Sequence, residues 1–208
     1  MKHNPFKIVK MFEEEIAGYA GSKYAVSVDS CTNALFLCCK YLKVNKVTIP
    51  SHTYLSVPMS IINSGGEVIF DKRQKSNHWV GNYQLKPYPI YDSAKRLTSN
   101  MYIKDSFMCL SFHIKKQLPI GKGGMILTDD SKAFDWFKRA RYEGRGEVYY
   151  KEDDIKSTGW NMYMTPEQAA RGLSLMQNYP THNNDIEEKN GYIDLTEFSV
   201  FSGNEIIE

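Results

Sequence analysis

The residues from Ser111 to Gly124 bring a hydroxyl group, an imidazole, two adjacent lysines and several glycines into one short stretch, S-F-H-I-K-K-Q-L-P-I-G-K-G-G. Apolar runs flank it, Phe107–Leu110 before and Met125–Leu127 after, and short apolar runs bounded by turn residues predict buried strands. A lysine held between such strands can lose hydration, which lowers its pKa and makes its amine nucleophilic. The alternative is a basic, exposed β-hairpin, and this stretch alone does not decide between the two.

Other polar groups also stand directly after short predicted strands. Residues 30–32, Ser-Cys-Thr, lie between a strand at 23–28 and an apolar helical stretch at 34–42. Free N–H groups and the dipole at a helix N-terminus favour an anion, so this turn is either a phosphate site or a simple helix cap. Thr53 and Tyr54 follow a strand at 46–49. Asp92 ends the run 88–91, where it can face a ligand, cap a helix or do both.

Predicted strands and helices alternate around these groups. The predicted helices are 6–20, 34–42, a separate stretch that opens at 50–56 and runs through Ile62, 131–142 and 165–176. The predicted strands are 23–28, 46–49, 67–70, 88–91 and the two runs that flank 111–124. Residues 71–87 give no confident element, 144–156 read as a loop, and 191–201 as at most a short strand or hairpin arm. This alternation predicts an α/β domain with a mostly parallel central sheet, whose functional groups gather at the carboxyl ends of the strands.

Composition narrows the class of protein. With 208 residues, of which 42% are hydrophobic and 24% charged, the chain fits one globular domain, or one domain and a small appendage. A net charge of +2 gives no reason to expect nucleic acid or an anionic membrane as a partner. The chain shows no apolar run long enough to span a membrane and no secretory core near Met1, so a cytoplasmic location is expected. The four cysteines and five histidines lack metal-ligand spacing, and no metal is expected.

Taken in order, the motifs resemble those of the DegT/DnrJ/StrS-type sugar aminotransferases, which are pyridoxal-phosphate enzymes of fold type I. The resemblance covers residues 6–177 and rests on the order of several motifs. Residues 30–35 resemble the family's Ser-Gly-Thr-x-Ala-Leu turn, 50–54 its Pro-Ser-x-Thr-aromatic segment, 91–94 its Glu-Asp-Ala-Ala, 111–124 its Ser-Phe-His-x-x-Lys and Gly-Glu-Gly-Gly, and 159–164 its Gly-x-Asn-Tyr-Arg-Met.

The resemblance implies a role for each matching residue. Lys116 would form the internal aldimine with pyridoxal 5'-phosphate, Asp92 would pair with the pyridinium nitrogen, and Tyr54 would stack on the ring. The remaining implied site residues are the phosphate ligands Ser30, Cys31, Thr32 and Ser111, the site-lining Lys95 and His113, and Asn161, which would reach the phosphate of the neighbouring subunit in a homodimer.

The resemblance also implies the domains and the reaction. Residues 1–177 would be the cofactor-binding large domain, and residues 178–208 a short C-terminal extension in place of the family's small domain. The implied reaction moves an amino group from an amino acid donor to a nucleotide-linked keto sugar. Two alternatives stay open: a pyridoxal-phosphate lyase acting on another amine, and a non-catalytic remnant or partner subunit.

Some residues depart from the family pattern. Cys31 stands in place of the turn glycine, which requires a negative φ at this position. Lys95 replaces Gln or His, Lys122 replaces an acid, and Tyr163 replaces Arg.

Overall fold

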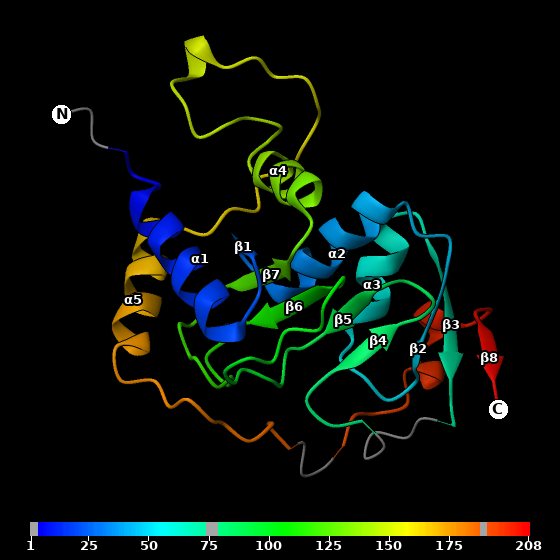
Figure 1. The fold of residues 1–208 in the computed structure, drawn as a ribbon. Helices are drawn as coiled ribbons and strands as arrows, with labels where there is room; N and C mark the ends of the chain where they lie inside the picture. The colour runs from blue at the N-terminus through cyan, green and yellow to red at the C-terminus, as the bar shows by residue number, and fades with distance from the viewer. Residues whose placement is uncertain (1–3, 74–78, 188–190) are drawn as a thin grey trace.

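The structure is a computed structural model that describes residues 4–73, 79–187 and 191–208, in which helices cover both faces of a β-sheet (Figure 1). Its helices are α1 (Lys7–Ala20), α2 (Cys31–Leu42), α3 (Ser56–Asn63), α4 (Ser131–Ala140) and α5 (Pro166–Met176). Its strands are β1 (Tyr24–Val28), β2 (Lys46–Pro50), β3 (Glu67–Asp71), β4 (Tyr83–Leu85), β5 (Ile90–Asp92), β6 (Phe107–Ser111), β7 (Gly124–Thr128) and β8 (Glu205–Ile207). The α/β class predicted from the sequence is confirmed.

The strands form two sheets that meet edge to edge. The larger has the order β1-β7-β6-β5-β4 and the smaller the order β2-β3-β8. Thr48 of β2 and Lys86, just after β4, exchange backbone hydrogen bonds of 2.8 and 3.1 Å, which joins the sheets. The sheet is mixed rather than mostly parallel: β5–β6, β2–β3 and β3–β8 are parallel, whereas the other pairs of the larger sheet are antiparallel. Strands β4 and β5, and strands β6 and β7, are consecutive along the chain, and the segment between each pair reverses the chain direction. Strand β1 also pairs antiparallel with β7.

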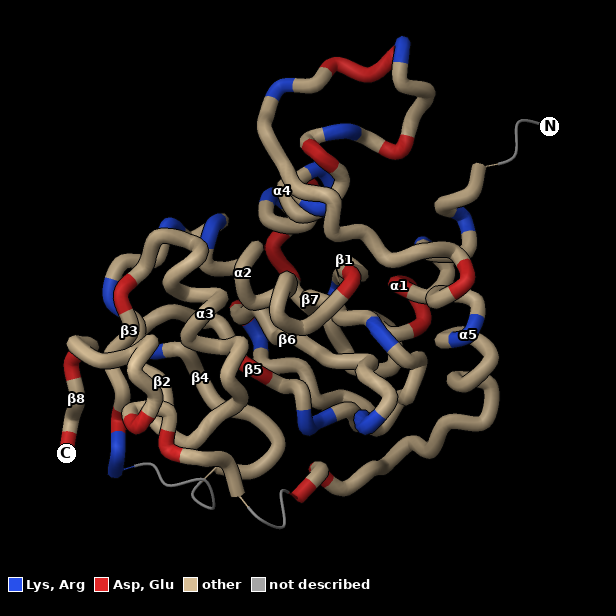
Figure 2. Tube along the Cα trace, turned by 180° about the vertical axis from the view of Figure 1, so that it is seen from behind, with Lys and Arg blue, Asp and Glu red and all other residues tan. Residues whose placement is uncertain are grey.

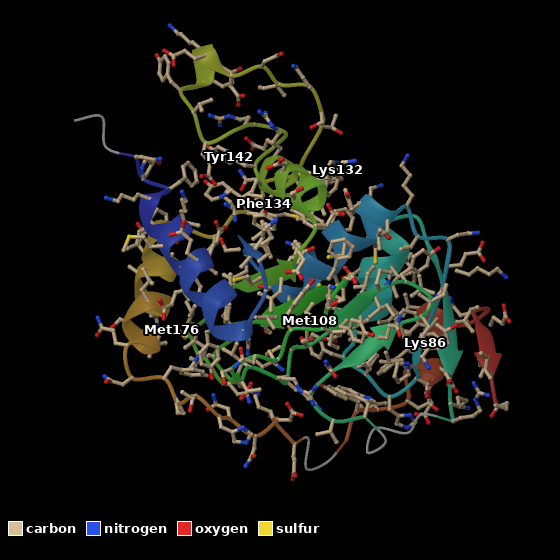
Figure 3. All side chains as sticks on the ribbon, in the orientation of Figure 1. Lys86, Met108, Lys132, Phe134, Tyr142 and Met176 are labelled. Carbon is tan, nitrogen blue, oxygen red and sulfur yellow. The ribbon has the colours of Figure 1, made fainter. Side chains whose placement is uncertain are left out.

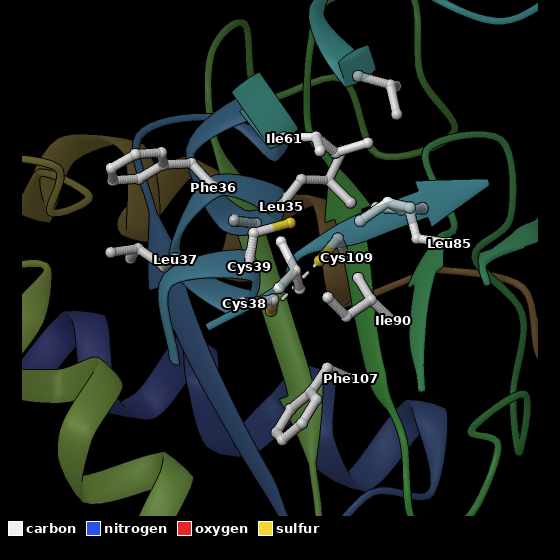
Figure 4. Packing of buried hydrophobic residues seen from close by; sticks show 14 of the residues in the cluster. Leu35, Phe36, Leu37, Cys38, Cys39, Ile61, Leu85, Ile90, Phe107 and Cys109 are labelled. Atoms are coloured by element: carbon white, nitrogen blue, oxygen red, sulfur yellow. Dashed lines mark hydrogen bonds between the residues drawn. The ribbon is translucent and has the colours of Figure 1, made fainter. Parts of the chain in front are cut away.

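Each face of the larger sheet has its own apolar core. On β6, Phe107 and Cys109 pack with α2, α3 and α4, whereas Met108 and Leu110 pack with α1 and α5. Figure 4 shows part of the first core, and Figure 3 labels Met108 and Met176, which belong to the second. Because both faces are covered, strands β6 and β7 are apolar at consecutive positions, which is the pattern the sequence shows.

Local signals in the sequence fix several helix ends. Helix α5 begins with a capping box between Thr165 and Gln168, and α1 ends at Gly21, whose φ of 84° is left-handed. Helix α2 begins at Cys31, earlier than predicted from its apolar run, because Ser30 caps it. The predicted loop after α4 projects from the body of the molecule and carries charges of both signs (Figures 1 and 2).

The C-terminal segment differs from the expectation of a short strand or hairpin arm at 191–201. Two short 3-10 turns form there, Leu195–Glu197 and Ser199–Phe201, and the strand, β8, comes later in the chain and extends the β2–β3 sheet. Leu195 and Phe201 are buried in the apolar core that lies between the sheet and helices α2, α3 and α4. Their contacts are long-range and leave no periodic pattern that the sequence could reveal.

Candidate active site

A cavity of about 520 Å³ opens beside the carboxyl ends of β5 and β6. Nine of the predicted site residues line it: Ser30, Cys31, Thr32, Tyr54, Asp92, Lys95, Ser111, His113 and Lys116. They come from four separate parts of the chain, 30–32, 54, 92–95 and 111–116, which the two sheets and α2 bring to one place. The remaining predicted residue, Asn161, does not line this cavity.

The turn before α2 is built to leave backbone donors free. Ser30 is extended, with φ −165° and ψ 156°, and its hydroxyl oxygen accepts the Asn33 N–H at 3.2 Å. Cys31 and Thr32 are the first helical residues, and their N–H groups have no acceptor within the helix. Helix capping and anion binding are therefore compatible here, because Ser30 caps while the two N–H groups of the first turn remain. Cys31 begins α2 with a negative φ, so its place in the glycine position involves no backbone strain.

Gly124 lets β7 pass directly beneath this turn. A Cβ atom at Gly124 would lie 2.4 Å from the Ser30 carbonyl carbon and 2.5 Å from the Cys31 nitrogen. These backbone atoms of the turn leave no room for any side chain at this position. The last glycine of the Ser111–Gly124 stretch thus sets the position of the turn before α2.

The segment from β6 to β7 is a hairpin with a folded tip. Phe112 and Gly123 continue the ladder beyond the strands, with the Phe112 N–H donating to the Gly123 carbonyl at 2.9 Å. Leu118, which is fully buried, ties the tip into the core between the sheet and α1. Lys116 is half-buried, and its N–H donates to the His113 carbonyl at 2.8 Å. The segment therefore combines the two sequence-based alternatives, since it is a basic hairpin whose tip presents Lys116 to the cavity.

Asp92 is the buried acid of the cavity, with only 6% of its surface exposed. One carboxylate oxygen, Oδ1, accepts the Ala94 N–H at 2.9 Å, and the other, Oδ2, accepts the Tyr83 hydroxyl at 3.2 Å. Burial raises the Asp92 pKa above its ordinary value, although the Ala94 N–H, the nearby Lys116 charge and the Tyr83 hydroxyl oppose this shift. A carboxyl group with these partners is held in one orientation at the cavity wall.

The sequence did not reveal the aromatic residues beside Lys95. The Lys95 side chain is 4% exposed, and its Nζ lies 4.4 Å from the ring centroid of Trp79 and 4.5 Å from that of Tyr192. Aromatic faces at this distance stabilise the ammonium form. Trp79 lies in the stretch without a predicted element and Tyr192 in the C-terminal segment. The sequence marks Trp79 and Tyr192 only as large aromatic residues within polar stretches, which does not by itself indicate a site.

Asn161 lies on an exposed bridge to Tyr142, where its side-chain amide donates to Glu143 at 3.0 Å. The motif is nevertheless attached to the turn before α2, because the Asp29 N–H donates to the Met162 carbonyl at 2.8 Å. This geometry leaves a role in a neighbouring subunit as a prediction.

A comparison with protein families matches the DegT/DnrJ/EryC1/StrS aminotransferase family over residues 3–79 and 101–194. The chain belongs to this family. The spore coat polysaccharide biosynthesis protein SpsC of Bacillus subtilis (strain 168) is 27% identical over 79% of this chain and 55% of its own length. The UDP-4-amino-4,6-dideoxy-N-acetyl-beta-L-altrosamine transaminase of Helicobacter pylori (strain ATCC 700392 / 26695) is 23% identical over 82% of this chain and 56% of its own length.

Solved structures of other proteins show the same fold. Helicobacter pylori PseC, an aminotransferase involved in the biosynthesis of pseudoaminic acid, superposes with a TM-score of 0.70 at 20% identity, over 84% of this chain and 58% of that one. The sugar aminotransferase Spr1654 of Streptococcus pneumoniae, described as putative and in its PMP form, gives 0.66 at 19% identity, over 84% and 59%. The chain spans little more than half the length of these relatives.

Two departures from the family pattern have clear surroundings. Lys122 lies 3.7 Å from Asp29, so a cation replaces the family's acid beside the turn before α2. Tyr163 packs edge-on against Phe6 and Tyr142, with ring centroids 6.1 and 5.1 Å away, in place of the family's arginine.

In the part of the chain that the structure describes, no helix is both long and apolar enough to cross a membrane.

Proposed function

We propose that this chain is a pyridoxal-phosphate-dependent aminotransferase that moves an amino group from an amino acid to a keto sugar. The supporting observation is that an amine, a buried carboxylate and a helix N-terminus line one cavity, contributed by Lys116, Asp92 and α2. Bound pyridoxal phosphate supplies an electron sink for a carbanion next to nitrogen. It requires an amine, a partner for its ring nitrogen and an anion site, and the residues present fit each requirement.

Each residue has a separate task in this proposal. The N–H groups of Cys31 and Thr32, with the Ser111 hydroxyl, would donate to the phosphate. Asp92 would accept the ring N–H, and Tyr54, which is 60% exposed, would cover one face of the ring. Lys116 Nζ would take a proton from the donor carbon that gives up the amino group and would later deliver a proton to the acceptor carbon that receives it.

We further propose that the C-terminal segment, residues 178–208, contributes one wall of the cavity. Ile186, Glu187 and Tyr192 line the cavity. The segment is held at its base by Asp185, whose carboxylate accepts two hydrogen bonds from Arg96 at 2.8 and 2.6 Å. The Ile186 N–H also donates to the Lys95 carbonyl at 2.9 Å. These contacts make the segment a wall of the cavity.

A homodimer is part of the proposal, because Asn161 does not line the cavity of its own chain. Sedimentation of the purified protein tests the dimer. Titration of Asn161→Ala with inorganic phosphate tests the shared site, because weaker phosphate binding by the variant is expected only if the side chain reaches the partner's cavity.

The decisive experiment is covalent trapping. The protein is incubated with pyridoxal phosphate, reduced with borohydride and digested, and the modified peptide is identified by mass spectrometry. We expect modification of Lys116, its loss in Lys116→Ala and its retention in Lys115→Ala, the matched neighbour that also lines the cavity. Absence of modification in the unaltered protein would favour the non-catalytic alternative.

A second measurement separates the reaction classes. Glutamate added without an acceptor should convert the bound cofactor stoichiometrically to its amine form. A lyase would instead release product while the cofactor returned unchanged. UDP-linked and free keto sugars then test the acceptor.

A further inference from the structure

Tyr83 of β4 connects two buried polar residues of the site. Its hydroxyl oxygen lies 2.5 Å from Thr53 Oγ1 and 3.2 Å from Asp92 Oδ2. All three residues are buried, with 1% of Thr53 and 6% each of Tyr83 and Asp92 exposed. They come from different elements, since Thr53 follows β2 and Asp92 ends β5. Burial removes the phenol hydroxyl and the carboxylate from water at a free-energy cost, which these hydrogen bonds offset.

The direction of these hydrogen bonds follows from the chemistry of the groups. An ionised carboxylate can only accept, so Tyr83 donates its single proton to Asp92. The Tyr83 oxygen then accepts the proton of the Thr53 hydroxyl. Burial and the nearby Asp92 charge raise the Tyr83 pKa well above its ordinary value, so the phenol keeps the proton that it donates. The resulting chain, from Thr53 through Tyr83 to Asp92, favours the ionised form of Asp92.

We propose that Tyr83 is a positioning residue, which with Thr53 holds Asp92 ionised and oriented so that it can accept an N–H from a ligand ring in the cavity. This inference rests on the proposed function, in which that ring belongs to pyridoxal phosphate. The Ala94 N–H fixes Oδ1 in the same way that Tyr83 fixes Oδ2. Each oxygen of Asp92 keeps further acceptor capacity, because a carboxylate has about four lone-pair sites.

Other titratable groups around Asp92 are accounted for. Lys95 follows it on the same connection and Lys116 faces it from the β6–β7 hairpin, and both cations favour its charged form. Cys31 of α2 and Cys109 of β6 also face it, but burial raises both thiol pKa values well above the ordinary value, so they stay neutral. Four groups therefore favour the ionised carboxylate of Asp92: two cations, a backbone N–H and the Tyr83 hydroxyl, which is the neutral side-chain donor among them.

The first test needs no cofactor. The carboxyl carbon of Asp92 is titrated by NMR in the apoprotein, and the signal is assigned with Asp92→Asn. Tyr83→Phe removes only the hydroxyl, and we expect Asp92 to become about tenfold easier to protonate, which moves its midpoint up by about one pH unit. Thr53→Val should move the midpoint in the same direction by less, and Thr53→Ser should restore it.

Tyr88→Phe is the matched control. Its hydroxyl accepts the Asn45 N–H at 2.8 Å and touches the neighbouring part of the sheet. The control should leave the Asp92 midpoint unchanged. An unchanged midpoint in both Tyr83→Phe and Thr53→Val, or an equal shift in Tyr88→Phe, would overturn the inference.

The second test uses pyridoxal phosphate. Affinity of Tyr83→Phe for the cofactor should fall by up to about tenfold at a pH below the Asp92 midpoint of the unaltered protein and much less at a pH well above the midpoint of the variant, because only the protonated fraction of Asp92 is lost as an acceptor. A purely structural defect would weaken binding equally at both pH values. If the unaltered protein binds no cofactor while the apoprotein midpoint still shifts, the proposed function fails and the Tyr83–Asp92 coupling stands. If it binds cofactor and the midpoint does not shift, the coupling alone fails.

Discussion

Glu13 of α1 is a buried acid with several charged and polar partners. Its carboxylate accepts the Ser27 N–H and hydroxyl, each at 2.9 Å, and lies 3.1 Å from Lys138 Nζ. It also forms an ion pair with Arg141, whose side chain is 1% exposed. Arg141 in turn donates its backbone N–H within α4 and accepts the Met162 N–H, so the cluster supports the chain that leads to the candidate site.

The perturbation is Glu13→Gln, which keeps the shape and removes the charge. Breaking a buried ion pair costs about 3–5 kcal/mol, because the partner is left as a buried, uncompensated charge. Arg141 retains Glu147 as a second partner at 2.8 Å, and Glu147 is only partly buried. We therefore expect a loss of about 3 kcal/mol in the free energy of unfolding, at the lower end of that range. For a chain of this length the melting temperature should fall by roughly 6–12 °C.

The effect should depend on pH. Burial raises the Glu13 pKa, but the Arg141 and Lys138 charges and the Ser27 N–H outweigh it, so the pKa lies below its ordinary value of 4.5. A depressed folded-state pKa contributes stability that is fully present above pH 4.5 and is lost as the pH falls through the folded-state value. The difference between Glu13→Gln and the unaltered protein should therefore be constant near neutral pH and shrink in acid.

Urea unfolding at pH 7 measures the effect, with Glu14→Gln as the control. Glu14 is the next residue on the same helix, and its pair with Lys10 is exposed, with 3.6 Å between Nζ and Oε1. That substitution should cost less than about 0.5 kcal/mol. In a double-mutant cycle, Arg141→Met should recover much of the loss from Glu13→Gln. Equal losses for Glu13→Gln and Glu14→Gln would refute the reasoning.

Three further predictions concern the turn before α2, the C-terminal segment and the apolar core. Gly124→Ala should lower the free energy of unfolding by about 1–3 kcal/mol and weaken phosphate binding, because its Cβ would meet the backbone of the turn before α2. Gly18→Ala is the control, since a Cβ there would meet nothing within 4 Å, and it should cause no measurable loss in urea unfolding. Asp185→Asn should speed proteolysis within the C-terminal segment by breaking its paired hydrogen bonds to Arg96, and the exposed Asp154→Asn should not. Cys39, whose pKa burial raises to about 12, should react with a thiol reagent at pH 8 only after denaturation.

Much of the candidate site could be predicted because its residues stand in local, directional patterns. Lys116 lies between two apolar strands, Ser30 before a helix, and Asp92 at a strand end, and each pattern places a side chain at the carboxyl edge of the sheet. Nine of the ten predicted residues line the cavity, whereas their roles on a cofactor stay predictions. Helix ends were predictable for the same local reason, as the capping box at Thr165 shows.

The rest depends on contacts between distant parts of the chain. Tyr83 and Trp79 lie in a stretch without periodicity, and Tyr192 lies far along the chain, yet all three gather around Lys95 and Asp92. The direction of strand pairing also escaped the sequence pattern, because an apolar run covered on both faces looks the same in a parallel and an antiparallel neighbour.

The pairing of β8 with β3 has a consequence for how the chain folds as it is synthesised. Ile206 lies opposite Phe70, so strand β3, from the first half of the chain, pairs with residues that leave the ribosome more than 130 residues later. Until then the N–H and C=O groups on the outer edge of β3 have no strand partner, and such an edge can pair with another chain. Contacts of this sequence separation also slow the final step of folding. Nascent chains halted before residue 205 should therefore associate more readily than the chain that includes β8.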